Sequence, residues 1–484
     1  MILNHFFGKK GGGGGVTKQP YLLFKSDASF RMNILSNTPG WDGVTEYSDD
    51  LENWYVWSGS QISAALLEGK YILAFRGIGN TVFSTDSGAR FVFSGSAPID
   101  ADGDVDSLLD YQTYSTGGWA PRRESCFSGL FYGCALLRTA PALSSPFLTS
   151  SCYAQMFYQC SRMTEAPELP ATILQSNCYR EMFRYCTALT RAADMLAPVA
   201  ATYCCYRMYA SCSSLAVPPR IATRIAATNC FQYMFEYCSA LLTPPELPAM
   251  TLASYCYAQM FDHCTRLTSA PALPATVLAP SCYYAMFNSC SSLVEAPALP
   301  ATTLADGCYS TMFSSCNALV EAPALPATSL KYNCYYNMFS YCSRLTQAPA
   351  LPAIALMQQC YFGMFQNCTS LVTPPALPAT TLQTSCYAQM FQGCTSLAGM
   401  PELPALTISM AAYMNMFNGC TSLKLAAAQD SDYPNEFRIP SSGTGSAQSN
   451  SFTNMFAGTG GTFTGTPTVN TSCYTPNAIV PAAA

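Results

Sequence analysis

The chain has 484 residues, of which 50% are hydrophobic and 11% charged, and its formal net charge is −5. A chain of this length exceeds what one compact core can organise. The low charge excludes a strongly basic surface, so no nucleic-acid partner is expected. No run of 18 apolar residues occurs, so no transmembrane segment is expected either.

The first 98 residues divide into two predicted segments. Residues 1–17 are rich in glycine, which predicts a flexible tail. Lys9 and Lys10 come late and five glycines follow, so this start does not match a signal peptide, and the expected location is a virion or the cytoplasm. Residues 18–98 alternate apolar and polar side chains between Gly, Asn and Asp, which predicts a β-sandwich-like domain.

Residues 99–125 are predicted to be a junction and N-terminal cap for the repeats that follow. The acidic run from Asp100 to Asp106 fits two interpretations, a calcium-binding loop or a solvated linker. An EF-hand loop needs glycine at its sixth position and glutamate at its twelfth. Here Gly103 is fourth and Tyr111 is twelfth, which favours the linker.

Residues 126–423 contain about twelve copies of a 26-residue repeat with two cysteines. The first cysteine recurs from Cys126 to Cys386, and Ala412 replaces it in the twelfth copy. The second follows eight residues later, from Cys134 to Cys420. A fixed period of this length predicts a solenoid, in which each unit packs against its neighbours. Positions within a repeat are numbered below as offsets from the first cysteine, which has offset 0.

Each repeat is predicted to contain one short helix and one short strand. In residues 282–307, apolar side chains fall at offsets 0, 1, 4, 5 and 8, which share one face of a helix. The segment VEAPALPAT (294–302) favours an extended conformation, although proline limits its pairing. The expected fold class is therefore α+β, a small β-domain followed by a leucine-rich-repeat-like solenoid. The predicted core of two representative repeats comprises Cys256, Met260, Phe261, Cys264, Leu267, Cys282, Met286, Phe287, Cys290 and Leu293.

The 25 cysteines allow three interpretations. Free cysteine is often buried and packs as a small hydrophobe, so structural thiols are expected. Disulfides between neighbouring coils are an alternative, because adjacent coils are expected to lie about 5 Å apart. Zinc needs four grouped ligands, which an eight-residue gap and only two histidines do not supply. No metal and no other cofactor is expected.

Residues 424–484 are predicted to form an irregular C-terminal cap. They hold a faint copy of the repeat motif at residues 451–456, one period plus 13 residues beyond the last repeat. Such an atypical terminal unit is common in repeat proteins, because the end of the stack must be covered.

The sequence holds no recognisable catalytic arrangement. His263 and Cys264 are adjacent, but Cys264 belongs to the second cysteine ladder, which recurs in every copy. A nucleophile also needs a base within reach and a group that orients the base. No Walker loop, Rossmann fingerprint or HExxH motif is present, so the chain is not expected to be an enzyme.

The strings MFNSCSSLVEAPALPATTL (286–304) and MFQNCTSLVTPPALPATTL (364–382) resemble a known repeat class. They are similar to the BspA-type leucine-rich repeats of gut bacterial surface proteins and their phages. Residues 42–77 resemble a small β-domain that precedes such repeats. The resemblance implies a curved solenoid and a role in adhesion, host recognition or protein interaction. The 26-residue length and the prolines depart from the usual form.

The outward offsets of the predicted helix carry aromatic and polar residues, a mixture typical of binding surfaces. The candidate ligand-binding residues are Tyr185, Tyr233, Tyr237, Tyr284, Tyr336, Tyr341 and Phe362. An ordinary solvated face is the alternative, and offset 13 of the strand is a second candidate surface. The sequence thus predicts a non-enzymatic recognition or adhesion protein that binds a host-surface glycan or protein, such as a phage tail-fibre or host-binding component. The alternative is an intracellular protein-interaction scaffold of a gut bacterium, and the oligomeric state is left open.

Overall fold

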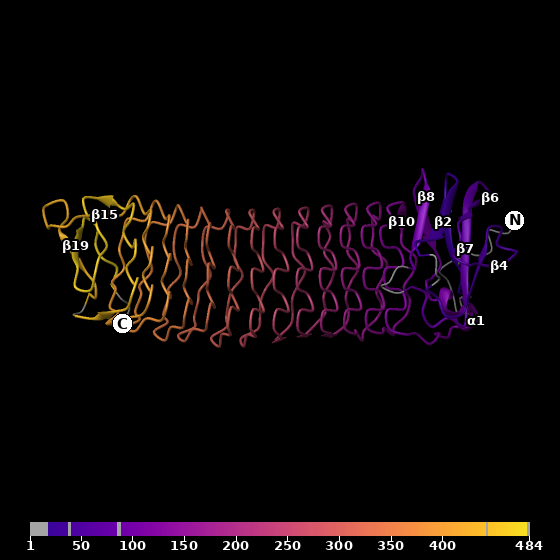
Figure 1. Cartoon of the computed structure of the whole chain (residues 1–484), viewed down its shortest axis with the longest axis horizontal. Helices are drawn as coiled ribbons and strands as arrows, with labels where there is room; N and C mark the ends of the chain where they lie inside the picture. Colours follow the sequence, from indigo (N-terminus) through magenta and orange to yellow (C-terminus); the bar gives the residue numbers. More distant parts are fainter. Residues whose placement is uncertain (1–17, 37–39, 85–88, 442–443, 482–484) are drawn as a thin grey trace.

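The computed structural model describes residues 18–36, 40–84, 89–441 and 444–481. The predicted tail at residues 1–17 lies outside the described residues. The molecule is elongated (Figure 1). A group of strands occupies the N-terminal end, a long row of similar coils follows, and a smaller group of strands closes the C-terminal end.

Two sheets make up the N-terminal end. One has the strand order β10-β9-β1-β7-β3-β4, with β6 also paired to β7, and the other has the order β5-β2-β8. Phe24, Phe75 and Phe91 pack between them, with ring centroids 5.6–6.0 Å apart. The strands are β1 (Leu22–Ser26), β2 (Phe30–Ile34), β3 (Val44–Ser48), β4 (Tyr55–Val56), β5 (Ile62–Ser63), β6 (Ala65–Leu67), β7 (Lys70–Ile78), β8 (Phe91–Gly95) and β9 (Ile99–Asp102).

The first coil is joined directly to this end. Its strand β10 (Leu137–Thr139) pairs in parallel with β9, and Phe131 packs against Phe91 with ring centroids 5.6 Å apart. Helix α1 (Ser107–Ser115), interrupted at Asp110, packs against β7. The hydrophobic core therefore runs without a break from the N-terminal sheets into the coils.

The expected α+β architecture, a leucine-rich-repeat-like solenoid with one helix and one strand per coil, is wrong. Residues 126–423 are all described, and they contain no helix. Offsets −1 to 8 instead form a continuous series of turns, called here the turn run. The N–H groups at even offsets donate to the carbonyl three residues back, as Met286 does to Tyr283. Those at odd offsets donate to the next coil, as Phe287 does to Met312.

The turn run uses left-handed backbone at every fourth residue. In one coil these are Ser281, Ala285 and Ser289, with φ of 51°, 49° and 59°. Positive φ at the third residue is what a type II turn requires. A right-handed α-helix cannot contain such residues, because left-handed backbone winds the chain in the opposite sense and breaks the i to i−4 hydrogen-bond series. The apolar side chains therefore repeat every four residues along the turn run.

The rest of each coil is extended but pairs only briefly. Two-residue strands occur in a few coils, namely β11 (Val199–Ala200), β12 (Ile225–Ala226), β13 (Thr251–Leu252) and β14 (Thr407–Ile408). Other coils are linked here by single parallel bridges, such as Glu295 to Glu321 and Val277 to Thr303. The prolines at offsets 15 and 18 explain the short strands, because proline has no N–H to donate.

Stacked rings and thiols fill the interior of the coils. From Phe131 to Phe417 the rings at offset 5 stack with centroids 5.3–5.8 Å apart. A second stack at offset 1 runs from Tyr257 to Tyr413. Fully buried, at 0% exposure, are Cys256, Met260, Phe261, Cys264, Leu267, Cys282, Met286, Phe287, Cys290 and Leu293.

The C-terminal end continues the coils and then closes them. A further turn run at residues 449–457 accepts hydrogen bonds from residues 38 positions earlier, whereas the regular coils bond across 25. Phe456 stacks on Phe417 and contacts Phe437, which covers the last coil. The strands are β15 (Lys424–Leu425), β16 (Asn435–Arg438), β17 (Ser446–Ala447), β18 (Gly460–Gly461) and β19 (Ser472–Thr475); β14 pairs with β17, β15 with β18, and β16 with β19.

Candidate functional site

The side chains that leave the turn run on its outer side form one long surface, called here the turn face. Offsets 0, 1, 4, 5 and 8 point into the core, so offsets 2, 3, 6 and 7 point outward. Because successive coils are bonded in register, each of these offsets forms a row along the molecule. The turn face is therefore a set of rows whose side-chain chemistry changes from coil to coil.

The N-terminal half of the turn face, from Arg180 to His263, carries charges that are paired with one another; it is called here the charged zone. Arg184 bonds Glu181 at 2.5 Å, and Arg207 lies 3.6 Å from Glu236. Burial raises the pKa of the Glu236 carboxyl, although Arg207 opposes this shift. Arg207 and Glu236 thus link two neighbouring coils, whereas Arg184 and Glu181 pair within one coil.

The aromatic rings of the charged zone are also engaged within the molecule. The Arg184 guanidinium lies 4.8 Å from the ring centroid of Tyr185, and that of Arg207 lies 4.3 Å from Tyr233. The ring of Tyr237 stacks on His263 with centroids 4.4 Å apart. Each of these three predicted ligand-binding tyrosines therefore has one ring face covered by an internal partner.

The C-terminal half, from Tyr284 to Gly419, has no charged side chain at offsets 2, 3, 6 or 7; it is called here the neutral zone. Tyr336 and Phe362 stack with centroids 5.0 Å apart and are half-buried. Among the described residues, no aromatic or cationic group contacts the rings of Tyr284 and Tyr341, and Tyr341 is 51% exposed. Gln366 donates to Gln392 at 2.9 Å, which links two coils through their amides.

The structure puts all seven predicted ligand-binding residues on the turn face but does not gather them at one place. Three lie in the charged zone and four in the neutral zone. The sequence analysis missed Tyr332 and Tyr255, each 42% exposed. They stand at offsets −2 and −1, which lie four residues before the outward offsets 2 and 3. A helix predicted to begin at offset 0 left both outside it.

A second surface lies on the extended side of the coils. Six large apolar side chains in consecutive coils are between 46% and 64% exposed there, and they are called here the apolar stripe. Parallel pairing links several of them, as at Phe147 with Ile173 and Val199 with Ile225. The stripe comprises Phe147, Ile173, Val199, Ile225, Met250 and Val277. Contiguous exposed apolar surface of this kind is typical of protein interaction sites.

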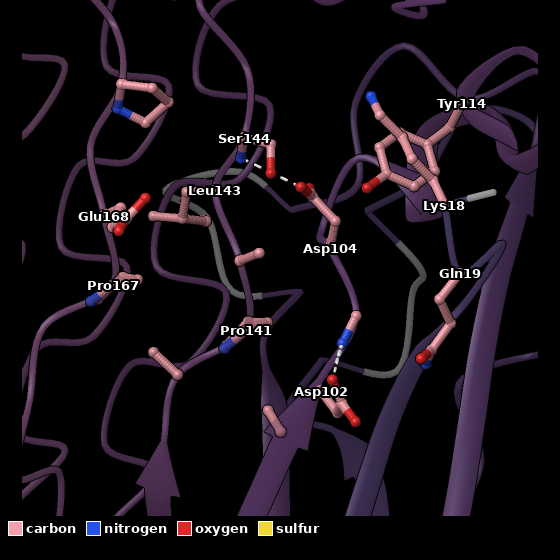
Figure 2. A pocket seen from close by; sticks show the side chains of 15 residues that line it. Lys18, Gln19, Asp102, Asp104, Tyr114, Pro141, Leu143, Ser144, Pro167 and Glu168 are labelled. Atoms are coloured by element: carbon pink, nitrogen blue, oxygen red, sulfur yellow. Dashed lines mark hydrogen bonds between the residues drawn. The ribbon is translucent and has the colours of Figure 1, made fainter. Parts of the chain in front are cut away.

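A cleft of about 700 Å³ separates the N-terminal end from the first two coils (Figure 2). On the N-terminal side, the Lys18 ammonium lies 4.5 Å from the ring centroid of Tyr114 and 4.2 Å from that of Trp119. The opposite wall includes Pro141, Leu143 and Pro167. The cleft combines the Lys18 cation with the acidic side chains of Asp102, Asp104 and Glu168.

The acidic run beside this cleft does not converge on a common point. Asp100 pairs with Arg138, Asp102 with Lys25 and Asp106 with Arg122. The Asp104 carboxylate accepts hydrogen bonds from the backbone N–H groups of Asp106 and Ser144. The carboxylates thus have separate partners, and the described residues contain no group of three or more His, Cys, Asp or Glu side chains placed to hold a metal ion.

The cysteines are free and buried throughout the described chain. Burial raises the pKa of the Cys342 and Cys394 thiols to about 12, which disfavours the reactive thiolate. Cys264 donates its S–H to the Phe235 carbonyl, whereas His263 bonds Asp262, so these two neighbours do not form a nucleophile–base pair. The thiols act in packing and hydrogen bonding in this arrangement.

No protein-family model matches the chain, and none of the curated proteins is similar to it. The resemblance to BspA-type repeats therefore stays a prediction. Within the described ranges, none of the helical structure has the length and apolar character that crossing a bilayer requires.

Proposed function

We propose that this chain is a non-enzymatic recognition protein that presents its turn face to a glycan or protein on a cell surface. The observation that carries the proposal is the neutral zone, where aromatic rings and amides are held in register and Tyr284 and Tyr341 have no aromatic or cationic ring partner in the part of the chain that the structure describes. Rigid aromatic side chains lose little entropy on binding, and amides adapt their hydrogen bonds to a ligand. The setting that we propose is a phage virion, as a tail-fibre or host-binding component, and this rests on the resemblance alone.

A second candidate function is a protein-interaction scaffold. The apolar stripe favours it, because exposed apolar side chains in six consecutive coils, five of them at offset 21 and Met250 at offset 20, are costly in water unless a partner covers them. A scaffold would bind through the extended side of coils near the N-terminal end, whereas a recognition protein would bind through the turn face of the later coils. The two functions therefore predict opposite effects of substitutions on the two surfaces.

The experiment compares three full-length, fluorescently labelled chains on a panel of gut bacteria and intestinal epithelial cells. Every substitution copies a residue that stands at the same or a neighbouring offset in another coil, so that the turn geometry is preserved. The turn-face variant carries Tyr284→Ser, Tyr336→Ser, Tyr341→Ser and Phe362→Ala, after Ser310, Ser315 and Ala388. The stripe variant carries Phe147→Thr, Ile173→Thr and Val277→Thr, after Thr303.

Recognition through the turn face predicts that the unmodified chain and the stripe variant bind the same cells and that the turn-face variant does not. Loss of binding in the stripe variant alone favours the scaffold. If neither variant alters cell binding, or if no cell in the panel is bound, the recognition proposal is wrong. As a control, the thermal unfolding of the three chains is compared. Equal unfolding temperatures would show that a loss of cell binding does not come from misfolding.

A further inference from the structure

We infer that the neutral zone around Tyr336, Tyr341 and Phe362 is a binding site for an uncharged polysaccharide that runs along the stacked coils. The inference rests on the proposed recognition function and names the ligand class of its site. Four features of the turn face carry it: rings without a charged partner, the lack of charged side chains, the amide and hydroxyl groups, and a backbone whose N–H groups are all bonded within the stack.

The first feature is the difference between the rings of the two zones. Tyr185, Tyr233 and Tyr237 each have one ring face covered by an arginine or a histidine. In the neutral zone Tyr341 is half exposed, and the stacked pair of Tyr336 and Phe362 is only half-buried. Tyr341 thus offers a half-exposed ring without an aromatic or cationic partner among the described residues, and Tyr336 and Phe362 offer the faces that their mutual stacking leaves uncovered.

The second feature is the charge of the zone. No Asp, Glu, Lys or Arg stands at offsets 2, 3, 6 or 7 from Tyr284 to Gly419. A ligand with one charge per repeating unit would lose hydration on this surface and gain no ion pair. Lys331 and Arg344 lie beyond the two ends of the turn run of the same coil, so an acidic ligand would have to bind at those margins.

The third feature is the supply of groups that both donate and accept hydrogen bonds. Asn337, Gln366 and Asn367 stand at outward offsets of the same two coils as the rings, and serine or threonine hydroxyls occupy these offsets in the coil before. Amides and hydroxyls match the mixed donor and acceptor pattern of sugar hydroxyls. Because each row repeats once per coil, a polymer with a regular repeat can make the same contact several times.

The fourth feature excludes an extended peptide as the occupant. All ten N–H groups from Asn333 to Cys342 donate to carbonyls of their own coil or the next. A peptide that adds a strand needs free backbone groups on its partner. The surface therefore recognises its ligand through side chains alone, which suits stacking on sugar rings.

The test uses affinity electrophoresis of the purified full-length chain in gels that contain one polysaccharide each. The uncharged probes are laminarin, dextran and galactomannan, and the charged probes are polygalacturonate and chondroitin sulfate. We expect retardation by at least one uncharged probe, with an unchanged dissociation constant between about 0.05 and about 0.5 M NaCl, because no ion pair is screened. Tyr336→Ser with Phe362→Ala is expected to weaken this binding at least about tenfold.

Tyr206→Gln, which copies Gln232 at the same offset of the charged zone, is the matched control and should bind as the unmodified chain does. The less disruptive single variant Tyr341→Ser, which copies Ser315, should weaken binding as well, so a folding defect in the double variant does not decide the result. Retardation by charged probes only, lost in Lys331→Gln or Arg344→Gln, would overturn the inference. So would equal binding by the double variant. If cells bind the chain while no uncharged probe does, this inference fails and the recognition proposal stands.

Discussion

The cysteine at offset 8 has a specific hydrogen-bonding role at the scale of the single residue. Its thiol donates to the carbonyl at offset 5 of the preceding coil, as in Cys290 to Phe261 at 3.1 Å and Cys264 to Phe235 at 3.0 Å. The Phe261 carbonyl also accepts the N–H of Cys264, so both of its lone pairs are used. Burial of this cysteine follows from the repeat pattern, but the thiol bond could not be predicted, because it depends on how far the coils are shifted along each other.

The two cysteine ladders should therefore differ in their tolerance of alanine. Cys290→Ala removes a hydrogen bond and leaves a cavity, and we expect it to lower the free energy of unfolding by about 1–3 kcal/mol. Cys282→Ala is the matched control, because its Sγ makes no hydrogen bond to the described residues and Ala412 occupies the same offset naturally. Urea unfolding measures both. A loss at Cys282 that equals or exceeds the loss at Cys290 would contradict the role of the thiol bond.

Asp106 gives a pH dependence at the junction of the N-terminal sheets and the coils. Burial raises its pKa from 3.8 to about 7, and Arg122, 2.9 Å away, opposes the shift. The folded chain thus holds a proton that the unfolded chain releases above pH 3.8. The stabilisation that this proton gives to the folded chain is complete below pH 3.8 and is lost as the pH rises through 7.

We expect the unfolding free energy of the unmodified chain to fall, relative to Asp106→Asn, by up to about 4 kcal/mol between pH 4 and 7. Thermal unfolding of both chains across this range measures the difference. Asp100→Asn, which removes a carboxylate of the same acidic run that pairs with Arg138 away from Arg122, is measured in parallel as the control substitution. A constant difference between Asp106→Asn and the unmodified chain at every pH would show that Asp106 does not titrate in this range.

The turn run is the element that the sequence analysis assigned wrongly, and the reason is geometric. An α-helix advances 100° per residue, whereas a four-residue repeat corresponds to 90°. Over the eight residues from Cys282 to Cys290 the two patterns differ by only about 80°, so both put the same side chains inside. A better signal was present at offsets −1, 3 and 7, where Gly307, Gly363 and Gly393 stand among asparagines and serines. Glycine and asparagine at every fourth residue favour left-handed backbone and oppose a helix.

Substitution at one of these left-handed positions tests the turn run. Ser315 has a φ of 61°, and Gly393 and Gly419 stand at the same offset in other coils. Ser315→Gly relieves a steric cost, which the greater entropy of the unfolded chain partly offsets, so we expect a gain of up to about 1 kcal/mol in unfolding free energy. Ser315→Val should lose about 1 kcal/mol or more, because a β-branched side chain fits poorly at positive φ. If valine were tolerated as well as glycine, the left-handed assignment would be wrong.

For the whole molecule, the arrangement follows from bonds that connect each coil only to its neighbours. The ring stack at offset 5 continues from Phe131 in the first coil to Phe456 beyond the last. Because the terminal rings would otherwise be exposed to water, other segments must cover both ends of the stack, as Phe91 and Phe437 do. The 26-residue period and the faint motif at residues 451–456 make that continuity predictable. The parallel pairing of β10 with β9 was not predictable, because β10 belongs to the first repeat whereas β9 precedes the repeats and does not share their motif. The division of the turn face also escaped prediction, because ring partners such as Arg184 and Arg207 are visible only in three dimensions.

The left-handed residues of the turn run, and the backbone hydrogen bonds by which its odd offsets join each coil to the next, depend on coils built from turns without helix. Far-UV circular dichroism of the intact chain measures this directly. The structure predicts a spectrum without the 222 nm minimum of an α-helix, since α1 is the only helix among the described residues. A helical signal equivalent to about a fifth of the chain, as one two-turn helix per coil would give, would contradict the account.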